Sequence, residues 1–165
     1  MLLAVRLGLC LLSVSALAAT SSGGLSAATR EVAHPVVRGS AGPFAQVTVT
    51  LTRPAEPDGA PFRGELRAGR RVIALTGPDE PAGFFIIEPR AVLFTPVDRS
   101  RRNGVVVLYR SSQIGPGHGT EHRALVYRVE PTRAVRLPAV ERQLEGARDT
   151  VTARKRLQAM VSAAY

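Results

Sequence analysis

The chain has 165 residues, of which 22 are lysine or arginine and 13 are aspartate or glutamate, so its formal net charge is +9 at neutral pH. This length suits one domain with a substantial hydrophobic core. Tryptophan is absent, and the few Phe and Tyr residues are not interleaved with arginines as they are on a base-stacking surface. We therefore expect no nucleic-acid partner.

The first eighteen residues have the pattern of a secretory signal peptide. Arg6 precedes an apolar run from Leu7 to Leu17, and Ala16 and Ala18 form an A-x-A cleavage site. The run is shorter than the roughly 20 residues that span a bilayer. We expect a signal peptide over residues 1–18, an exported (periplasmic or secreted) mature protein, and no stable membrane span after cleavage.

Cys10, the only cysteine, lies inside this apolar run. The residue before it, Leu9, is not small, which disfavours a lipoprotein anchored through Cys10. Cleavage after Ala18 would leave a mature chain with neither disulfide bonds nor thiolate ligands. It would also remove Arg6 and lower the net charge to +8.

Beyond the signal peptide, the sequence predicts a leader and then a first strand. Residues 19–43 are rich in Ser, Gly and Ala, which predicts a flexible leader with a short extended piece at Val36 and Val37. From Ala45 to Arg53, small or apolar residues alternate strictly with Gln and Thr. This period of two indicates a strand with one solvated face.

Short apolar runs separated by turn signals continue to residue 136. Residues 63–75 predict a hairpin around Ala68-Gly69. Residues 84–97 are more apolar than alternating, as expected of central strands covered on both faces, and residues 104–110 and 124–129 predict two further strands. The spacing of the turns predicts an antiparallel meander, small barrel or sandwich over residues 44–136.

The end of the chain has the pattern of an amphipathic helix over residues 138–161, packed on the β domain. Apolar residues recur at steps of four, three and four, at Val140, Leu144, Ala147 and Val151. The next stripe positions are Arg154 and Gln158. We therefore expect the helix to dock only as far as Val151 and its basic end to project. The predicted fold class is mainly β with a C-terminal helix (α+β).

Residues 118–122 contain His118, Glu121 and His122 in the order H-x-x-E-H, the signature of inverted zinc metallopeptidases. In those enzymes both histidines stand one helical turn apart and share a zinc ion. The glycines and the proline at residues 115–119 oppose a helix. An extended segment would hold the two histidines roughly 13 Å apart. A metal-dependent hydrolase using these three residues is therefore the alternative function, and we expect no cofactor.

The glycines of the same loop have two interpretations. Gly115, Gly117 and Gly119 are typical of a hairpin loop that needs positive backbone angles. Alternatively, their amides could form an anion cradle, helped by Arg110 and Arg123.

Residues 91–129 carry a family resemblance. The segment "AVLFTPVDRSRRNGVVVLYR", followed by a glycine-rich loop and "HRALVYRV", resembles the FG-GAP or VCBS type of strand-loop-strand unit of small secreted bacterial proteins. In that family the loop has the form D-x-D-G-D-x and often holds calcium. The matching positions are Asp98, Ser100 and Asn103. Because three arginines occupy this loop, the resemblance implies a scaffold that has lost its metal. Asn103-Gly104 is independently a turn dipeptide.

The basic side chains suggest the function. All of them except Lys155 are arginine, whose guanidinium group binds phosphates and carboxylates bidentately. We predict an exported, non-enzymatic envelope or periplasmic module that binds an envelope protein or an anionic cell-surface polymer. A purely structural or interaction protein is the other interpretation. The candidate ligand-binding or anion-binding residues are Arg99, Arg101, Arg102, His118, His122 and Arg123. The strand over residues 105–110 separates their two loops, which should therefore lie at its opposite ends.

Overall fold

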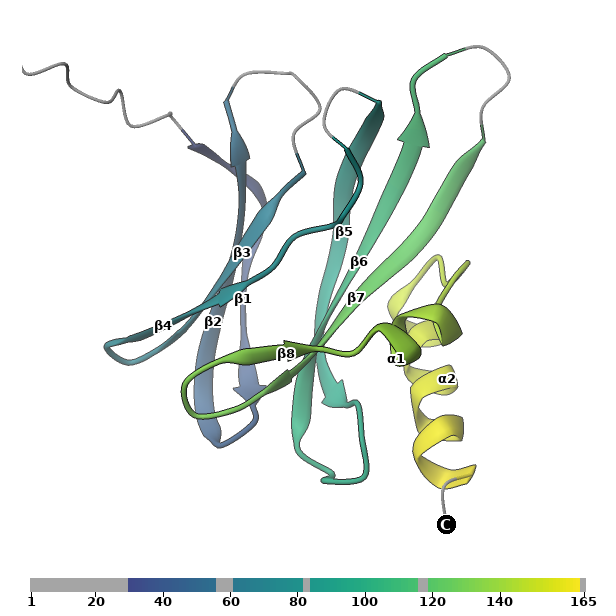
Figure 1. Cartoon of the computed structure of the whole chain (residues 1–165). Helices are drawn as coiled ribbons and strands as arrows, with labels where there is room; N and C mark the ends of the chain where they lie inside the picture. Colours follow the sequence, from purple (N-terminus) through teal and green to yellow (C-terminus); the bar gives the residue numbers. More distant parts are fainter. Residues whose placement is uncertain (1–29, 56–60, 82–83, 116–118, 164–165) are drawn as a thin grey trace, which may run out of the picture.

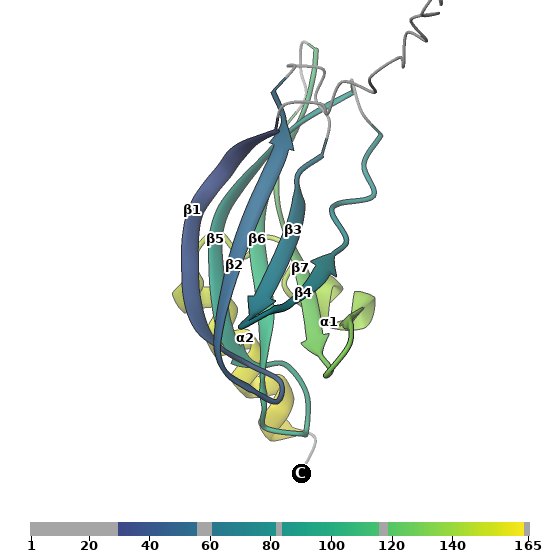
Figure 2. The same cartoon turned by 90° about the vertical axis from the view of Figure 1, so that its left-hand side faces the viewer.

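The computed structural model describes residues 30–55, 61–81, 84–115 and 119–163. Within these residues the chain forms two four-stranded antiparallel sheets, packed face to face, and two helices (Figures 1 and 2). The predicted fold class is therefore confirmed. Of the proposed β architectures, the sandwich is the one that forms, because the two sheets do not close into a barrel.

The first sheet contains the predicted half-solvated strand. Its strand order is β1-β2-β3-β4. The strands are β1 (Arg30–Ala41), β2 (Phe44–Pro54), β3 (Arg63–Ala68) and β4 (Arg71–Leu75). On β2, Val47, Val49 and Leu51 are buried while the threonines between them remain partly exposed. The hairpin at Ala68-Gly69 is also confirmed, with Gly69 in the left-handed region at a φ of 58°.

The second sheet lies at the centre of the molecule. Its strand order is β5-β6-β7-β8. The strands are β5 (Phe85–Pro96), β6 (Asn103–Gln113), β7 (Thr120–Val129) and β8 (Ala134–Arg136). Every residue from Gly104 to Tyr109 is buried. An apolar run without alternation is expected where both faces of a strand are covered.

Two apolar clusters fill the two faces of the second sheet. One lies between the sheets and includes Leu51, Leu66, Val107 and Leu125. The other lies between the second sheet and the helices. Its buried members are Leu93, Val97, Val106, Leu108, Ala124, Val126, Leu144, Ala147, Ala153 and Leu157. The molecule therefore has three layers: sheet, sheet and helices.

Three predictions about the strands are wrong. Residues 84–97, predicted as central strands covered on both faces, form β5, which is an edge strand with only three buried residues. Residues 30–41, predicted as part of a flexible leader over residues 19–43, instead form β1, which pairs with β2 through a register interrupted by irregularities. Those irregularities hide the period of two in the sequence. Asn103-Gly104 does not form a turn but begins β6, where a side chain on Gly104 would collide with the Tyr127 carbonyl oxygen at 2.4 Å.

The predicted single helix is two helices, α1 (Pro138–Gln143) and α2 (Thr150–Ala163). Gly146 separates them with a φ of 75°. Asp149 then caps α2, since its Oδ1 accepts the Thr152 N–H at 2.8 Å. None of the described helices is long and apolar enough to cross a membrane.

Because of this break, α2 buries a different face from the one that the sequence predicts. Val151, the expected last contact, is 60% exposed, whereas Ala153 and Leu157 are fully buried. The helix therefore packs on the sheet well beyond Val151. Part of its basic segment also folds back, because Arg156 donates to the carbonyl oxygens of Gln143 and Glu145 at 3.3 and 2.6 Å.

Replacement of Leu157 by alanine should lower the free energy of unfolding by about 2–5 kcal/mol, because it leaves a cavity between α2 and the second sheet. Val151→Ala on the same helix should change it by less than about 0.5 kcal/mol. Urea unfolding followed by circular dichroism measures both. Equal losses for the two variants would contradict this packing.

Candidate functional site

The turn between β5 and β6 presents the first predicted basic group. Asp98 Oδ1 accepts the Ser100 N–H at 2.8 Å, and Ser100 Oγ accepts the Arg102 N–H at 3.3 Å. Arg101 has a φ of 58°, in the left-handed region. These contacts fix the backbone of a short turn, and the side chains of Arg99, Arg101 and Arg102 are exposed on it.

His122 and Arg123, of the second predicted group, pair with Arg110 and Tyr109 toward the other end of β6, as expected. Seven to eight residues, or roughly 25 Å of strand, separate those positions from Arg102. The two groups therefore cannot form one site. His118 lies outside the described residues. His122 and Arg123 are half-buried neighbours on β7, and neighbours on a strand point to opposite faces of a sheet.

The same alternation bears on the hypothetical metal site. Glu121 and His122 lie on β7, so the helix that the H-x-x-E-H motif requires is not formed at these residues. The Glu121 carboxylate accepts two hydrogen bonds from Arg123, at 2.8 and 2.5 Å, and points away from His122. Within the part of the chain that the structure describes, no three His, Cys, Asp or Glu side chains are grouped to hold a metal ion.

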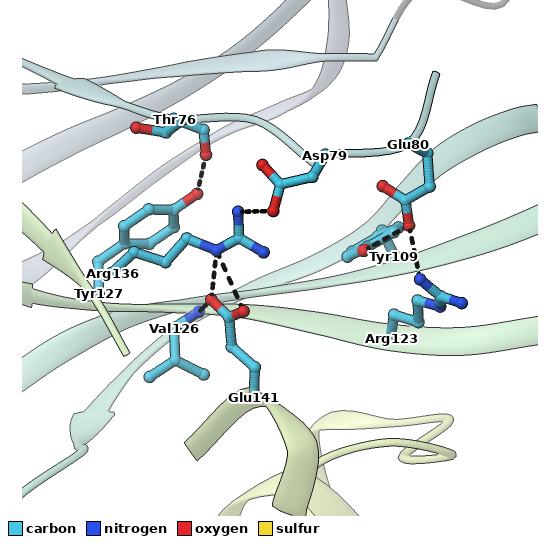
Figure 3. A network of polar contacts seen from close by, with 9 residues as sticks. All are labelled: Thr76, Asp79, Glu80, Tyr109, Arg123, Val126, Tyr127, Arg136 and Glu141. Atoms are coloured by element: carbon cyan, nitrogen blue, oxygen red, sulfur yellow. Dashed lines mark hydrogen bonds and ion pairs between the residues drawn. The ribbon is translucent and has the colours of Figure 1, made fainter. Parts of the chain in front are cut away.

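A buried polar cluster that the sequence did not reveal lies beside Arg123 (Figure 3). Glu80, in the connection between β4 and β5, has a side chain only 7% exposed. Its Oε1 accepts the Tyr109 hydroxyl at 2.9 Å and Arg123 Nη1 at 3.1 Å. Its Oε2 is buried without a hydrogen-bond partner among the described residues. Arg123 is thus engaged by two carboxylates and is not a free anion-binding cation.

A second part of this cluster joins α1 to the edge of β7. Glu141, on α1, accepts the Val126 N–H at 3.1 Å and Arg136 Nε at 2.8 and 3.1 Å. Arg136 also donates to Asp79 at 2.5 Å. Glu141 is 8% exposed, so its carboxylate needs this full set of donors.

Burial and neighbouring charges raise the pKa values of two tyrosines and one arginine in this cluster. Burial raises the pKa of Tyr109, and the neighbouring Glu80 carboxylate raises it further. Burial also raises the pKa of Tyr127, whose hydroxyl donates to the Thr76 carbonyl oxygen. The hydrogen bond to Glu141 raises the pKa of Arg136. These interactions connect the β4–β5 segment, the second sheet and α1, which indicates a structural role.

A distinct feature is the outer face of the first sheet, which no other described element covers (Figure 2). Arg38 on β1, Thr48 on β2 and Arg67 on β3 are consecutive partners across the sheet. They line an open hollow of about 760 Å³. No carboxylate belongs to the described residues that line it, although Arg67 contacts Glu65 at 3.2 Å nearby.

Comparison of the chain with protein-family models, curated proteins and solved structures gave no match.

Replacement of Glu141 by alanine should lower the free energy of unfolding by about 3–5 kcal/mol, because the buried Val126 N–H and Arg136 lose their acceptor. Chemical denaturation measures the loss. Glu145→Ala removes an exposed carboxylate just beyond α1 and should cost less than about 0.5 kcal/mol. If the two variants were equally stable, Glu141 would not have the structural role assigned to it.

Alkaline conditions should destabilise the protein through the two buried tyrosines. Their native pKa values lie above the ordinary value of 10.0, so the unfolded chain releases these protons at lower pH than the folded chain. The resulting stability is present below pH 10 and is lost as the pH rises beyond it. Tyr165→Phe removes the third tyrosine, so that tyrosinate absorbance reports only Tyr109 and Tyr127. Ionisation near pH 10 without loss of tertiary structure would contradict the burial.

Proposed function

We propose that this protein is an exported, non-enzymatic envelope or periplasmic module that binds an anionic polymer at the outer face of its first sheet. The observation that carries the proposal is the cross-strand row Arg38–Thr48–Arg67 beside an open hollow. Export rests on the signal-peptide pattern of residues 1–18.

The spacing of this row supports a repeating ligand. Arg38 and Arg67 stand on strands that flank β2, so their Cα atoms are roughly 10 Å apart. Thr48 lies between them, and its position in the alternation of β2 directs its hydroxyl to the same face. Two guanidinium groups and a hydroxyl in one row can contact successive acidic groups of an extended chain.

The electrostatics of the hollow support an anion over a cation. Two arginines and no carboxylate belong to the described residues that line the hollow. Glu65, which contacts Arg67 at 3.2 Å nearby, offsets only one of the two positive charges, so the hollow attracts a negative group. Gln46 adds an amide that can donate or accept a hydrogen bond. The open shape of the hollow suits a polymer that lies across the sheet.

The β5–β6 turn is a separate candidate. Its arginines, Arg99, Arg101 and Arg102, are exposed on a hydrogen-bonded turn, and binding through them stays a prediction. In the second predicted group, Arg123 is already engaged by Glu80 and Glu121. This engagement makes the outer face of the first sheet the stronger candidate.

Retention on a dextran sulfate column tests the proposal. The Arg38→Thr/Arg67→Thr variant should elute at lower salt than the parent, because it loses the charges that contact the polymer. The matched control is Arg154→Gln/Lys155→Gln, which removes two exposed charges from α2 and should elute later than the sheet variant.

A third variant, Arg99→Ser/Arg101→Ser/Arg102→Ser, separates the two surfaces. If only this variant elutes early, the polymer binds at the β5–β6 turn and the sheet-face proposal is wrong. If all variants lose retention in proportion to the charge removed, no specific surface exists.

A further inference from the structure

Three exposed apolar side chains gather at the far end of the β5–β6 hairpin. Phe84, Ile86 and Ile114 are 64%, 51% and 56% exposed. The Ile114 N–H donates to the Phe84 carbonyl oxygen at 3.0 Å, and Ile86 is the partner of Ser112 in the strand register. We call these three residues the apolar tip.

The apolar tip lies on the helix-facing side of the second sheet, beyond the reach of the helices. Ile87 faces the first sheet in the core, so Ile86, its neighbour on the strand, faces the other way. The helices lie against the lower part of this sheet, whereas β5, β6 and β7 continue past them (Figure 1).

The polar groups beside the apolar tip satisfy one another. Ser112 and Thr120 share a hydrogen bond of 3.0 Å, and Arg110 donates to Glu88 at 2.5 Å. A surface whose polar groups are paired internally loses less on leaving water than one with unpaired groups. The apolar tip is therefore suited to an apolar environment.

Cations stand at the same end of the molecule. Strand β1 begins there with Arg30 and β3 begins there with Arg63 (Figures 1 and 2). Neither arginine has an acidic partner among the described residues. Apolar side chains together with such cations at one end are complementary to an anionic lipid surface, where the apolar groups enter the acyl boundary and the cations meet headgroups.

We propose that the apolar tip of Phe84, Ile86 and Ile114 inserts into the surface of an anionic membrane, with Arg30 and Arg63 on its headgroups. This inference is independent of polymer binding at the first sheet.

The absence of tryptophan from the chain allows a site-specific test. The full chain carrying Phe84→Trp places one fluorophore in the apolar tip, and Val151→Trp places one at a similarly exposed position of α2. Vesicles of phosphatidylcholine and phosphatidylglycerol with brominated acyl chains should shift the emission of Trp at position 84 to the blue and quench it. The emission of Trp at position 151 should change little. Both variants retain residues 1–29, so any binding through that segment is common to both.

Two further variants in the Phe84→Trp background identify the contributors. Ile86→Ser/Ile114→Ser should weaken vesicle binding by about tenfold or more, because two large apolar side chains are lost. Arg30→Ser/Arg63→Ser should weaken it by about fivefold for each arginine on anionic vesicles, and hardly at all on neutral vesicles.

Two outcomes would overturn the proposal. Equal quenching at positions 84 and 151 would mean that the apolar tip does not enter the bilayer. A blue shift at position 84 that appears without vesicles and grows with protein concentration would assign the apolar tip to a contact between copies of this chain.

Discussion

The edge of β7 that lacks a full-length strand partner is the constraint on which the rest of the structure depends. Residues 124–127 of β7 are buried on both faces of the sheet. Because β8 pairs only with residues 127–129, the earlier part of β7 lacks a strand partner on that side. Buried backbone groups without partners are costly. Residues from the C-terminal part of the chain supply the partners: Glu141 accepts the Val126 N–H, Val126 accepts the Leu137 N–H, and His122 accepts the Gly146 N–H.

These hydrogen bonds to the β7 edge determine where the helices lie. Glu141 reaches the β7 edge from α1, and Arg136, the last residue of β8, pairs with it there, which holds α1 close to β8. Gly146, whose N–H bonds to β7, then turns the chain, and α2 begins with a new orientation. The single amphipathic stripe in the sequence is therefore divided between two helices.

The same arrangement decides which surfaces remain open. The helices cover the lower part of one face of the second sheet, and the first sheet covers the other face. The outer face of the first sheet and the apolar tip are left uncovered by the described elements, and each has its own chemistry. The basic row of Arg38 and Arg67 is suited to acidic groups, whereas the apolar tip is suited to lipid.

The tertiary structure decides which arginines are available to a ligand. Arg123 follows glycines in a loop-like sequence that predicts anion binding, but Glu80, forty-three residues earlier, engages it inside the fold. Glu80 itself lies in a segment rich in turn residues, where nothing local indicates burial. Conversely, Arg38 lies in a segment whose composition predicts a flexible leader, and it becomes part of an ordered basic row.

The sequence by itself determined the fold class, the alternation of β2 and the β3–β4 hairpin. These features follow from local periodicity and turn chemistry, which each segment carries alone. Only the tertiary structure decided the pairing of β1, the break between the helices, the Glu80 and Glu141 clusters and the open surfaces. Each of these depends on partners distant in the chain, because a buried polar group or an irregular strand is stabilised by whichever element folds against it.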